Sequence, residues 1–183
     1  MIHKKRRPSE KVLAEGKFLR FIIKNSWEFI ERHTCSGVII ILAVTDDGKI
    51  VLTEQKRVPV GKKVIEFPAG LANDHKVKRK ESLYAAANRE LWEETGYRAR
   101  RFCTVAAGPT SGGLTSEIVT IVLAEDITKT GPGGGDESEA ITVHEVKGRD
   151  IDRWLRRKQR QGCLVDPKIY AGLYFLRKYN KVN

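Results

Sequence analysis

Two apolar runs joined by a turn dipeptide constrain the fold of this chain most strongly. The segment 37–58, GVIIILAVTDDGKIVLTEQKRV, places β-branched residues on both sides of Asp47-Gly48. Isoleucine and valine are enriched in strands, and an Asp-Gly pair favours the tight turn of a β-hairpin. The segment therefore predicts a hairpin with its turn at Asp47-Gly48.

Further strands are expected on both sides of this hairpin. GKFLRFIIKN and WEFIERH are typical of two strands separated by a turn at Asn25-Ser26, and VIEFPAG predicts a short strand that stops at Pro68. Other strands are expected at about 98–107, 117–124 and 140–146. A run of glycines and acidic residues between them, TKTGPGGGDESE, predicts a flexible loop.

Helical patterns occupy the middle and the end of the chain. ESLYAAANRELWEETGY is rich in Ala, Leu and Glu, and Gly96 near its end favours a C-terminal cap. RDIDRWLRRKQRQG and DPKIYAGLYFLRKYN predict two more helices, the last one starting at Asp166-Pro167. Strands mixed with helices in a chain of 183 residues indicate a single folded unit of the α/β (α+β) class.

Composition limits the setting in which this chain works. No apolar run is long enough to span a bilayer, and the basic start MIHKKRRPSE lacks the apolar core of a signal peptide, so a cytoplasmic location without membrane contact is expected. Cys35, Cys103 and Cys163 are far apart and odd in number, which favours reduced thiols over a disulfide framework or a zinc site.

The net charge of +11 is partly clustered, in the runs at 3–7, 76–80 and 156–160. Such runs can bind nucleic acid, but no recognition motif accompanies them. We therefore expect solvated basic surfaces rather than a nucleic-acid partner. A basic surface also attracts anionic small molecules, including nucleotides.

Three glutamates crowd one helical segment of this basic chain. Glu90, Glu93 and Glu94 lie three and four residues apart, which places them on one face of a helix. Carboxylates held together need compensation, and Mg²⁺ or Mn²⁺ with oxygen ligands supplies it. Spacing alone also allows an ordinary solvated acidic face, so both interpretations stay open on this pattern.

The context of the glutamates resembles the Nudix hydrolase signature. Glu81 is followed by seven residues and then by RELWEETGY, with Gly70 upstream. The family usually has five residues between this glycine and the glutamate, whereas ten residues, LANDHKVKRK, lie between them here. The simplest explanation of the difference is a five-residue insertion in the loop.

The resemblance implies a Mg²⁺ site, with Mn²⁺ possible, that hydrolyses a nucleoside diphosphate linked to another group. It implies that Glu90, Glu93, Glu94 and the backbone carbonyl of Ala69 are the metal ligands. Among them, Glu93 is also expected to be catalytic. It also implies a structural salt bridge between Glu81 and Arg89.

A longer stretch resembles the branch of this family that cleaves ADP-ribose and nucleoside diphosphate sugars. In EQKRVPVGKKVIEFPAGL the matching residues are Gln55, Arg57, Glu66, Pro68, Ala69 and Gly70. The implied fold is an α/β/α sandwich with a mixed β-sheet and extra N-terminal antiparallel strands. These strands, in residues 1–35, are expected to be exchanged across a homodimer, with the hydrolase domain at 36–183.

The same resemblance implies residues that contact a small-molecule nucleotide substrate. TSGGLTSE resembles a substrate loop of this branch, although Pro109 precedes the Thr-Ser instead of following the Ser. The expected contacts are Trp27, Arg57, Glu66, Ala69, Gly70, Ser111, Gly113 and Glu117. Trp27 is a candidate for stacking on the base, with packing in the dimer interface as the alternative. Arg57 is a candidate for pairing with a phosphate, with a surface ion pair as the alternative.

The glycine-rich segment GGGDESEAITVHEV resembles the acidic loop that carries the catalytic base in these relatives. Glu137 matches the base best, and Glu139 is the alternative. The sequence thus predicts hydrolysis of ADP-ribose or a nucleoside diphosphate sugar to a nucleoside monophosphate and a sugar phosphate. Hydrolysis of nucleoside triphosphates, dinucleoside polyphosphates or capped RNA is the alternative, and a non-catalytic ligand sensor is disfavoured because every signature glutamate is present.

Overall fold

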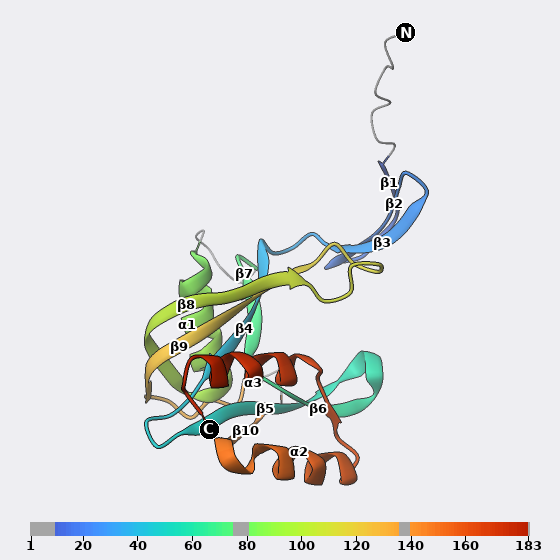
Figure 1. The fold of residues 1–183 in the computed structure, drawn as a ribbon. Coiled ribbons are helices and arrows are strands. Elements are labelled where there is room, and N and C mark those ends of the chain that lie inside the picture. Colours follow the sequence, from blue (N-terminus) through green and yellow to red (C-terminus); the bar gives the residue numbers. More distant parts are fainter. Residues whose placement is uncertain (1–9, 75–80, 136–139, 183) are drawn as a thin grey trace.

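The computed structural model describes residues 10–74, 81–135 and 140–182, which contain three sheets and three α-helices (Figure 1). The N-terminal sheet has the order β1-β2-β3: Glu10–Glu15, Leu19–Lys24 and Trp27–Arg32. The second sheet has the order β7-β4-β9-β8: Ala69–Ala72, Gly37–Ala43, Ile118–Lys129 and Tyr97–Pro109. The third has the order β10-β5-β6-β11: Thr142–Lys147, Lys49–Arg57, Lys62–Glu66 and Leu164–Val165. The helices are α1 Leu83–Thr95, α2 Ile151–Arg160 and α3 Lys168–Lys178.

The predicted hairpin around Asp47-Gly48 has its turn but not its pairing. Gly48 N donates to the Thr45 carbonyl and Thr45 N donates to the Lys49 carbonyl, and one bridge joins Val44 to Ile50. Beyond this bridge the two strands separate into different sheets. β4 pairs in parallel with β9, while β5 pairs with β6 and β10. The prediction that the two strands pair with each other along their length was therefore wrong, because each of them pairs with strands elsewhere in the sequence.

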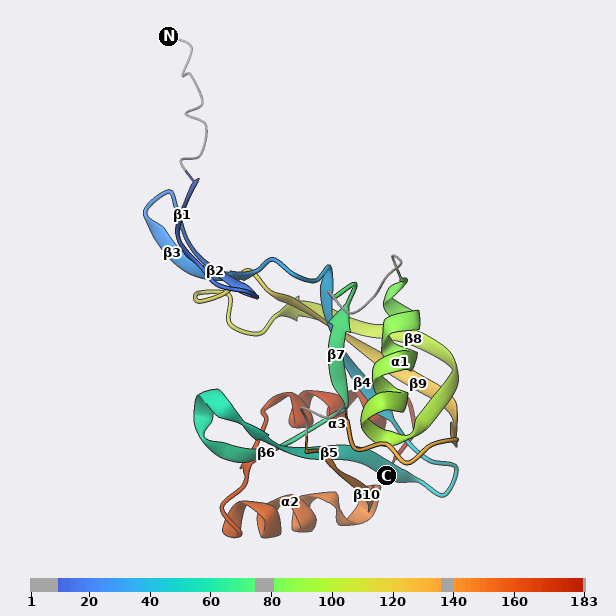
Figure 2. The same cartoon turned by 180° about the vertical axis from the view of Figure 1, so that it is seen from behind.

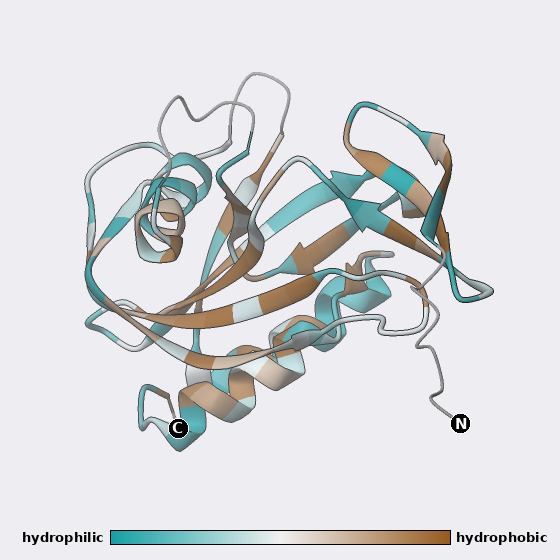
Figure 3. Ribbon diagram, turned by 90° about the horizontal axis from the view of Figure 1, so that it is seen from above, coloured by the Kyte–Doolittle hydropathy of each residue, from teal (hydrophilic) through white to brown (hydrophobic). Residues whose placement is uncertain are grey.

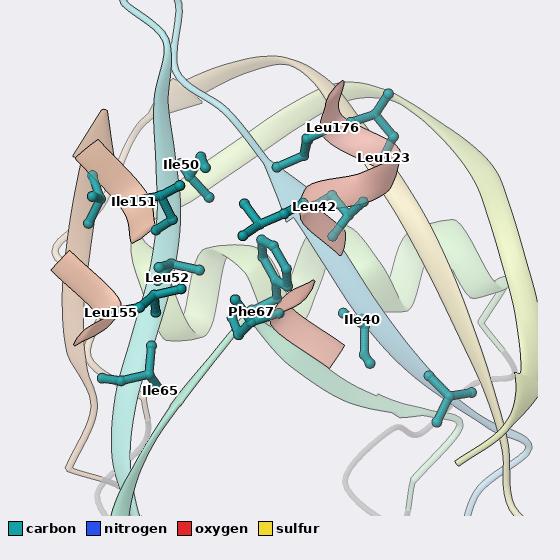
Figure 4. Packing of buried hydrophobic residues seen from close by; sticks show 14 residues of the cluster. Ile40, Leu42, Ile50, Leu52, Ile65, Phe67, Leu123, Ile151, Leu155 and Leu176 are labelled. Carbon is teal, nitrogen blue, oxygen red and sulfur yellow. The ribbon is translucent and has the colours of Figure 1, made fainter. Parts of the chain in front are cut away.

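β4 is covered on both faces, which explains its almost continuous apolar sequence. Ile39 and Ile41 pack with α1, in a cluster that includes Ala87 and Leu91. The alternate residues Ile40 and Leu42 belong to a second core, which β5, β6, α2 and α3 complete. Figure 4 shows Phe67 at the centre of that second core. In Figure 3 the central strands are mostly hydrophobic, whereas the helices carry both kinds of residue.

The α/β class and the mixed strand directions are confirmed, with the mixed sheet divided in two between helices. α1 packs on one face of the β7-β4-β9-β8 sheet, and α2 and α3 pack in the second core, on the opposite side of β4 (Figures 1 and 2). The predicted helices are present, and β8 and β9 are longer than expected. β1, β7 and β11 are additional strands that the sequence patterns did not predict. None of the helices in the described part of the chain combines the length and apolar character that a membrane span requires.

The N-terminal sheet stands apart from the rest of the chain (Figures 1 and 2). Its predicted turn is present, with Asn25 and Ser26 at φ 50° and 66°. It joins the body at the loop after β8, where Ile30 N donates to the Leu114 carbonyl at 2.8 Å and Ser116 N donates to the Ile30 carbonyl at 3.1 Å. These bonds bring β3 beside the loop that was expected to contact substrate.

Candidate active site

Helix α1 carries the three signature glutamates to one cleft. Its start is fixed by Ser82, whose side chain accepts from Ala85 N, and its end by Gly96 in the left-handed conformation. Between these caps, Glu90, Glu93 and Glu94 line a cleft of about 390 Å³. Arg89 of α1 and residues from β3, β4, β5, β7 and the neighbouring loops complete it, the latter being Arg32, Val38, Arg57, Ala69, Gly70, Leu71, Asp74 and Glu117.

Two of the glutamates are bound to the backbone of β7. Leu71 N donates to Glu90 Oε1 at 3.1 Å, and Ala69 N donates to Glu94 Oε2 at 3.1 Å. Glu94 is buried, with 5% of its surface exposed. Glu93 has a more exposed side chain. The helix and β7 therefore hold two of the carboxylates, and the third, on Glu93, accepts from Arg89 at 3.1 Å.

Gly70 lies between these two backbone contacts, and its lack of a side chain is required. A Cβ at this position would lie 2.0 Å from Glu90 Cδ and 2.2 Å from Glu90 Cγ. Real Cβ atoms do not approach other atoms so closely, so the glycine leaves room for the Glu90 carboxylate against the strand. Burial raises the pKa of Glu90, even though Arg89 and the Leu71 amide favour its charged form.

Arg89 links the acidic residues of the cleft. Its guanidinium donates to Glu81 and Glu90 at 2.9 Å each, to Glu93 at 3.1 Å and to the Leu71 carbonyl at 3.0 Å. The expected Glu81–Arg89 ion pair is thus present. Burial opposes the charged form of Glu81, but the hydrogen bond and charge of Arg89 and the Asn73 amide together outweigh burial and lower the Glu81 pKa.

The ends of the insertion are joined beside this ion pair. Glu81 N donates to Asn73 Oδ1 at 2.7 Å, and Asn73 N donates to Glu81 Oε1 at 3.2 Å. The two ends of the insertion are therefore held close together, and its first residues, 71 and 72, are the last two of strand β7. Its basic residues at 76–80 lie outside the described residues, so the basic-loop expectation stays a prediction.

The donors of this cleft fit a hard divalent cation by their chemistry. Carboxylate and carbonyl oxygens are the ligands that Mg²⁺ prefers. Among the described residues, no three side chains of Asp, Glu, His or Cys lie in positions that could together hold a metal ion. Instead, Arg89 occupies the space between Glu90 and Glu93. A cation at this place would therefore compete with Arg89 for the carboxylates of Glu90 and Glu93.

The other predicted contacts divide between the cleft and its surroundings. Arg57 and Glu117 line the cleft, and Arg57 Nε donates to Glu66 Oε2 at 2.7 Å. Trp27 has 62% of its surface exposed, and its indole donates to the Gly113 carbonyl at 3.4 Å. Trp27, Glu66, Ser111 and Gly113 are not among the residues that line the cleft. Glu137 and Glu139 lie outside the described residues, so the base assignment stays a prediction.

Sequence reasoning missed Arg32, which enters the cleft from the end of β3. Its Nε donates to Glu117 Oε1 at 2.9 Å, and both side chains are partly buried. No local pattern marks this arginine, because its partner is 85 positions away. Arg32 and Arg57 therefore add positive groups to the lining of the cleft, beside Arg89 and the carboxylates of α1.

A larger cavity of about 450 Å³ lies elsewhere, between the end of β8 and the start of α3. Its lining is mostly apolar, and its one acidic residue, Asp166, is paired with Lys168. The smaller acidic cleft is therefore the better candidate for chemistry.

Comparisons with known proteins identify a family for this chain. The family described as NUDIX domain matches residues 33–161. ADP-ribose pyrophosphatase of Bacillus subtilis (strain 168) is 39% identical over 142 residues, which cover 77% of this chain and 72% of that protein. ADP-sugar pyrophosphatase of Mus musculus is 31% identical over 188 aligned positions, covering 89% and 83%.

A solved structure described as an ADP compounds hydrolase has the same fold. Its TM-score is 0.68 at 19% identity, and the match covers 96% of this chain and 95% of that one. The family match spans well over half of the chain and includes Gly70, the insertion and the whole of α1. The chain therefore belongs to the NUDIX domain family.

Proposed function

We propose that this enzyme hydrolyses the pyrophosphate bond of ADP-ribose or of nucleoside diphosphate sugars, releasing a nucleoside monophosphate and a sugar phosphate. The observation that carries the proposal is a single cleft lined by Glu90, Glu93 and Glu94, with Glu90 packed against Gly70 and with Arg32, Arg57 and Arg89 in the same lining. The names of the two relatives support the choice of substrate class.

Glu90, Glu93, Glu94 and the Ala69 carbonyl would hold Mg²⁺, with Mn²⁺ as a substitute. The bound cation would neutralise pyrophosphate charge and lower the pKa of an attacking water. Arg57 and Arg32 line the same cleft and would orient the phosphates by charge-assisted hydrogen bonds. Glu137, or Glu139 as the alternative, would accept the proton of the water, and exposed Trp27 would stack on the base.

A substrate panel tests this proposal. Purified protein with Mg²⁺ is incubated with ADP-ribose, ADP-glucose, UDP-glucose, GDP-mannose, dinucleoside polyphosphates, nucleoside triphosphates and capped RNA, and products are separated by chromatography. We expect monophosphate from the sugar nucleotides and little from the others. Turnover of triphosphates or capped RNA alone would leave the metal site in place and refute the substrate class.

Metal removal should abolish turnover reversibly. Since carboxylates without a cation repel an anionic substrate, chelation with EDTA is expected to lower the rate by at least about a hundredfold. Adding excess Mg²⁺ should restore it. Thermal denaturation with and without EDTA serves as the control, and full activity in metal-free buffer would contradict the prediction.

Replacing Gly70 by alanine should impair the cleft with little effect on the rest of the chain. The new Cβ displaces the Glu90 carboxylate, and a displacement of this size can cost about a hundredfold in rate. Steady-state kinetics at several Mg²⁺ concentrations measures the effect. Gly108→Ala is the matched control, since a Cβ there meets nothing within 4 Å. Equal rates for the two variants would show that the close approach of Gly70 to Glu90 is dispensable.

The N-terminal strands are proposed to pair with a second copy of the chain in a homodimer. Every residue of β1 is exposed, and apolar side chains remain uncovered, among them Val12, Leu13, Phe18 and Leu19. Exposed apolar patches of this kind favour association. Light scattering after gel filtration should give twice the chain mass, and Leu19→Glu should reduce it toward one chain. A wild-type monomer would refute the dimer without affecting the cleft.

The cytoplasmic location also remains a proposal. Cys35, Cys103 and Cys163 are all free, as expected in a reducing compartment. Fractionation of the native cells with an antibody tests it, and recovery in a secreted fraction would overturn it.

A further inference from the structure

A glycine-rich segment packs against the end of the helix that carries the acidic residues. Gly134 N donates to the Glu94 carbonyl at 2.8 Å, and Gly135 N donates to the Glu93 carbonyl at 3.0 Å. Just before them, Thr130 N and Gly131 N both donate to the Gly96 carbonyl, at 2.8 and 3.1 Å. We call residues 130–135 the anchor segment.

Only glycine allows this close approach. A Cβ on Gly133 would lie 2.4 Å from the Thr95 carbonyl carbon and 2.7 Å from Gly96 N. A Cβ on Gly96 would lie 2.1 Å from the Gly131 carbonyl oxygen, and one on Gly131 would lie 2.8 Å from Trp92 Nε1. The two backbones are thus in direct contact, and Trp92 packs over the segment. This contact gives Trp92 and the glycines a role that the family resemblance did not assign.

The hydrogen bonds complete the end of α1. The last four carbonyls of a helix have no partner inside it, and most helices leave them to water or to a local cap. Here the Trp92 carbonyl is bonded by Gly96, while those of Glu93 and Glu94 are bonded by residues about forty positions further along the chain. These two carbonyls belong to the same residues whose carboxylates line the cleft. A distant segment therefore holds the backbone of two proposed metal ligands.

We propose that Gly133 is a positioning residue, which keeps the last turn of α1 and hence Glu93 and Glu94 in the arrangement that binds the divalent cation. The inference rests on the proposed function, because it assumes that these carboxylates hold the metal. A cation would compete with Arg89 for the Glu93 carboxylate, and a fixed backbone keeps that carboxylate within reach of the cation. Loosening the anchor segment should weaken metal binding before it affects the binding of substrate phosphates by Arg57 and Arg32.

The test compares two alanine substitutions at glycines with similar backbone conformations. Gly133 has φ +68° and tight contacts, whereas Gly48 has φ +75° and nothing within 4 Å of its Cβ position. Both variants carry the strain of alanine at positive φ, and only Gly133→Ala pushes against α1. Mn²⁺ affinity is measured by titration calorimetry without substrate, and KM for ADP-ribose is measured at saturating Mn²⁺.

We expect Gly133→Ala to weaken Mn²⁺ binding at least tenfold, with Gly48→Ala within about twofold of wild type, and KM at saturating metal nearly unchanged in both. If Gly133→Ala does not fold, Gly131→Ala replaces it in the test, because the nearest atoms to a Cβ at Gly131 are all in the Trp92 ring. Gly131→Ala is also expected to weaken Mn²⁺ binding. Wild-type affinity in the folded Gly133 or Gly131 variant overturns the inference and leaves the proposed function intact. A wild-type protein that binds no Mn²⁺ overturns the metal site itself and this inference with it.

Discussion

Replacing Glu94 by glutamine is expected to reduce kcat by about a thousandfold, the largest catalytic effect of any single change in this chain. Glu94 is buried at the cleft and faces β7, where Ala69 N donates to it at 3.1 Å. Glutamine keeps the size and the acceptor oxygen but removes the charge that a divalent cation needs. Stabilisation by a metal is worth several kcal/mol, and about 4 kcal/mol corresponds to roughly a thousandfold in rate.

The measurement is single-turnover and steady-state kinetics on ADP-ribose over a range of Mg²⁺ concentrations. Glu125→Gln is the matched control, because Glu125 pairs with Lys181 and Arg101 and does not line the cleft. We expect both variants to unfold near the wild-type temperature. Undiminished turnover in Glu94→Gln would disprove the metal-site interpretation of α1.

Replacing Glu54 by alanine is expected to destabilise the fold by about 3–5 kcal/mol, the largest effect on stability. Glu54 is buried, with 6% of its surface exposed, and accepts from Lys158 at 2.6 Å and from Lys63 and His144 at 2.9 Å each. These partners come from α2, β6 and β10. Removal of the carboxylate leaves the half-buried Lys158 and His144 without their acceptor, and breaking a buried pair in this way typically costs about 3–5 kcal/mol.

Urea unfolding followed by circular dichroism measures the loss. Glu15→Ala is the control, since Glu15 forms an exposed ion pair with Arg20 at 3.0 Å, which is worth at most about 1 kcal/mol. A loss below about 1 kcal/mol for Glu54→Ala would mean that the cost of burying these charges cancels their attraction.

The same cluster gives a pH dependence with a defined sign. Burial alone would raise the pKa of Glu54, but the hydrogen bonds from Lys158, Lys63 and His144 lower it from 4.5 to about 2. A carboxylate with a lowered folded pKa contributes stability above its unfolded pKa and loses it as pH falls toward the folded pKa. Wild type should therefore lose stability relative to Glu54→Ala between about pH 4.5 and 2. Parallel stability curves for the two proteins over this range would contradict the assignment.

The resemblance predicted the acidic cleft well where its contacts are local in sequence. The three glutamates share one face of α1 through spacings of three and four residues, so helical geometry alone brings them together. Glu81 lies before the helix, and its contacts with Asn73 hold it within reach of Arg89. The signature also marked Gly70, and the reason why glycine is needed there appears only when β7 lies against Glu90. Its contact with substrate stays a prediction. Glu66 pairs with Arg57, a residue that lines the cleft, and its own contact with substrate stays a prediction.

The sequence by itself determined the limits of α1, through the Ser82 and Gly96 caps, and most of the strands, through turn residues and β-branched runs. Only the tertiary structure decided that β4 pairs with β9 rather than β5, that Arg32 enters the cleft and that Glu54 is surrounded by three partners. The reason is that caps and turns depend on neighbouring backbone atoms. Strand pairing and buried ion clusters depend on which apolar faces pack together, and residues far apart in the chain supply those faces.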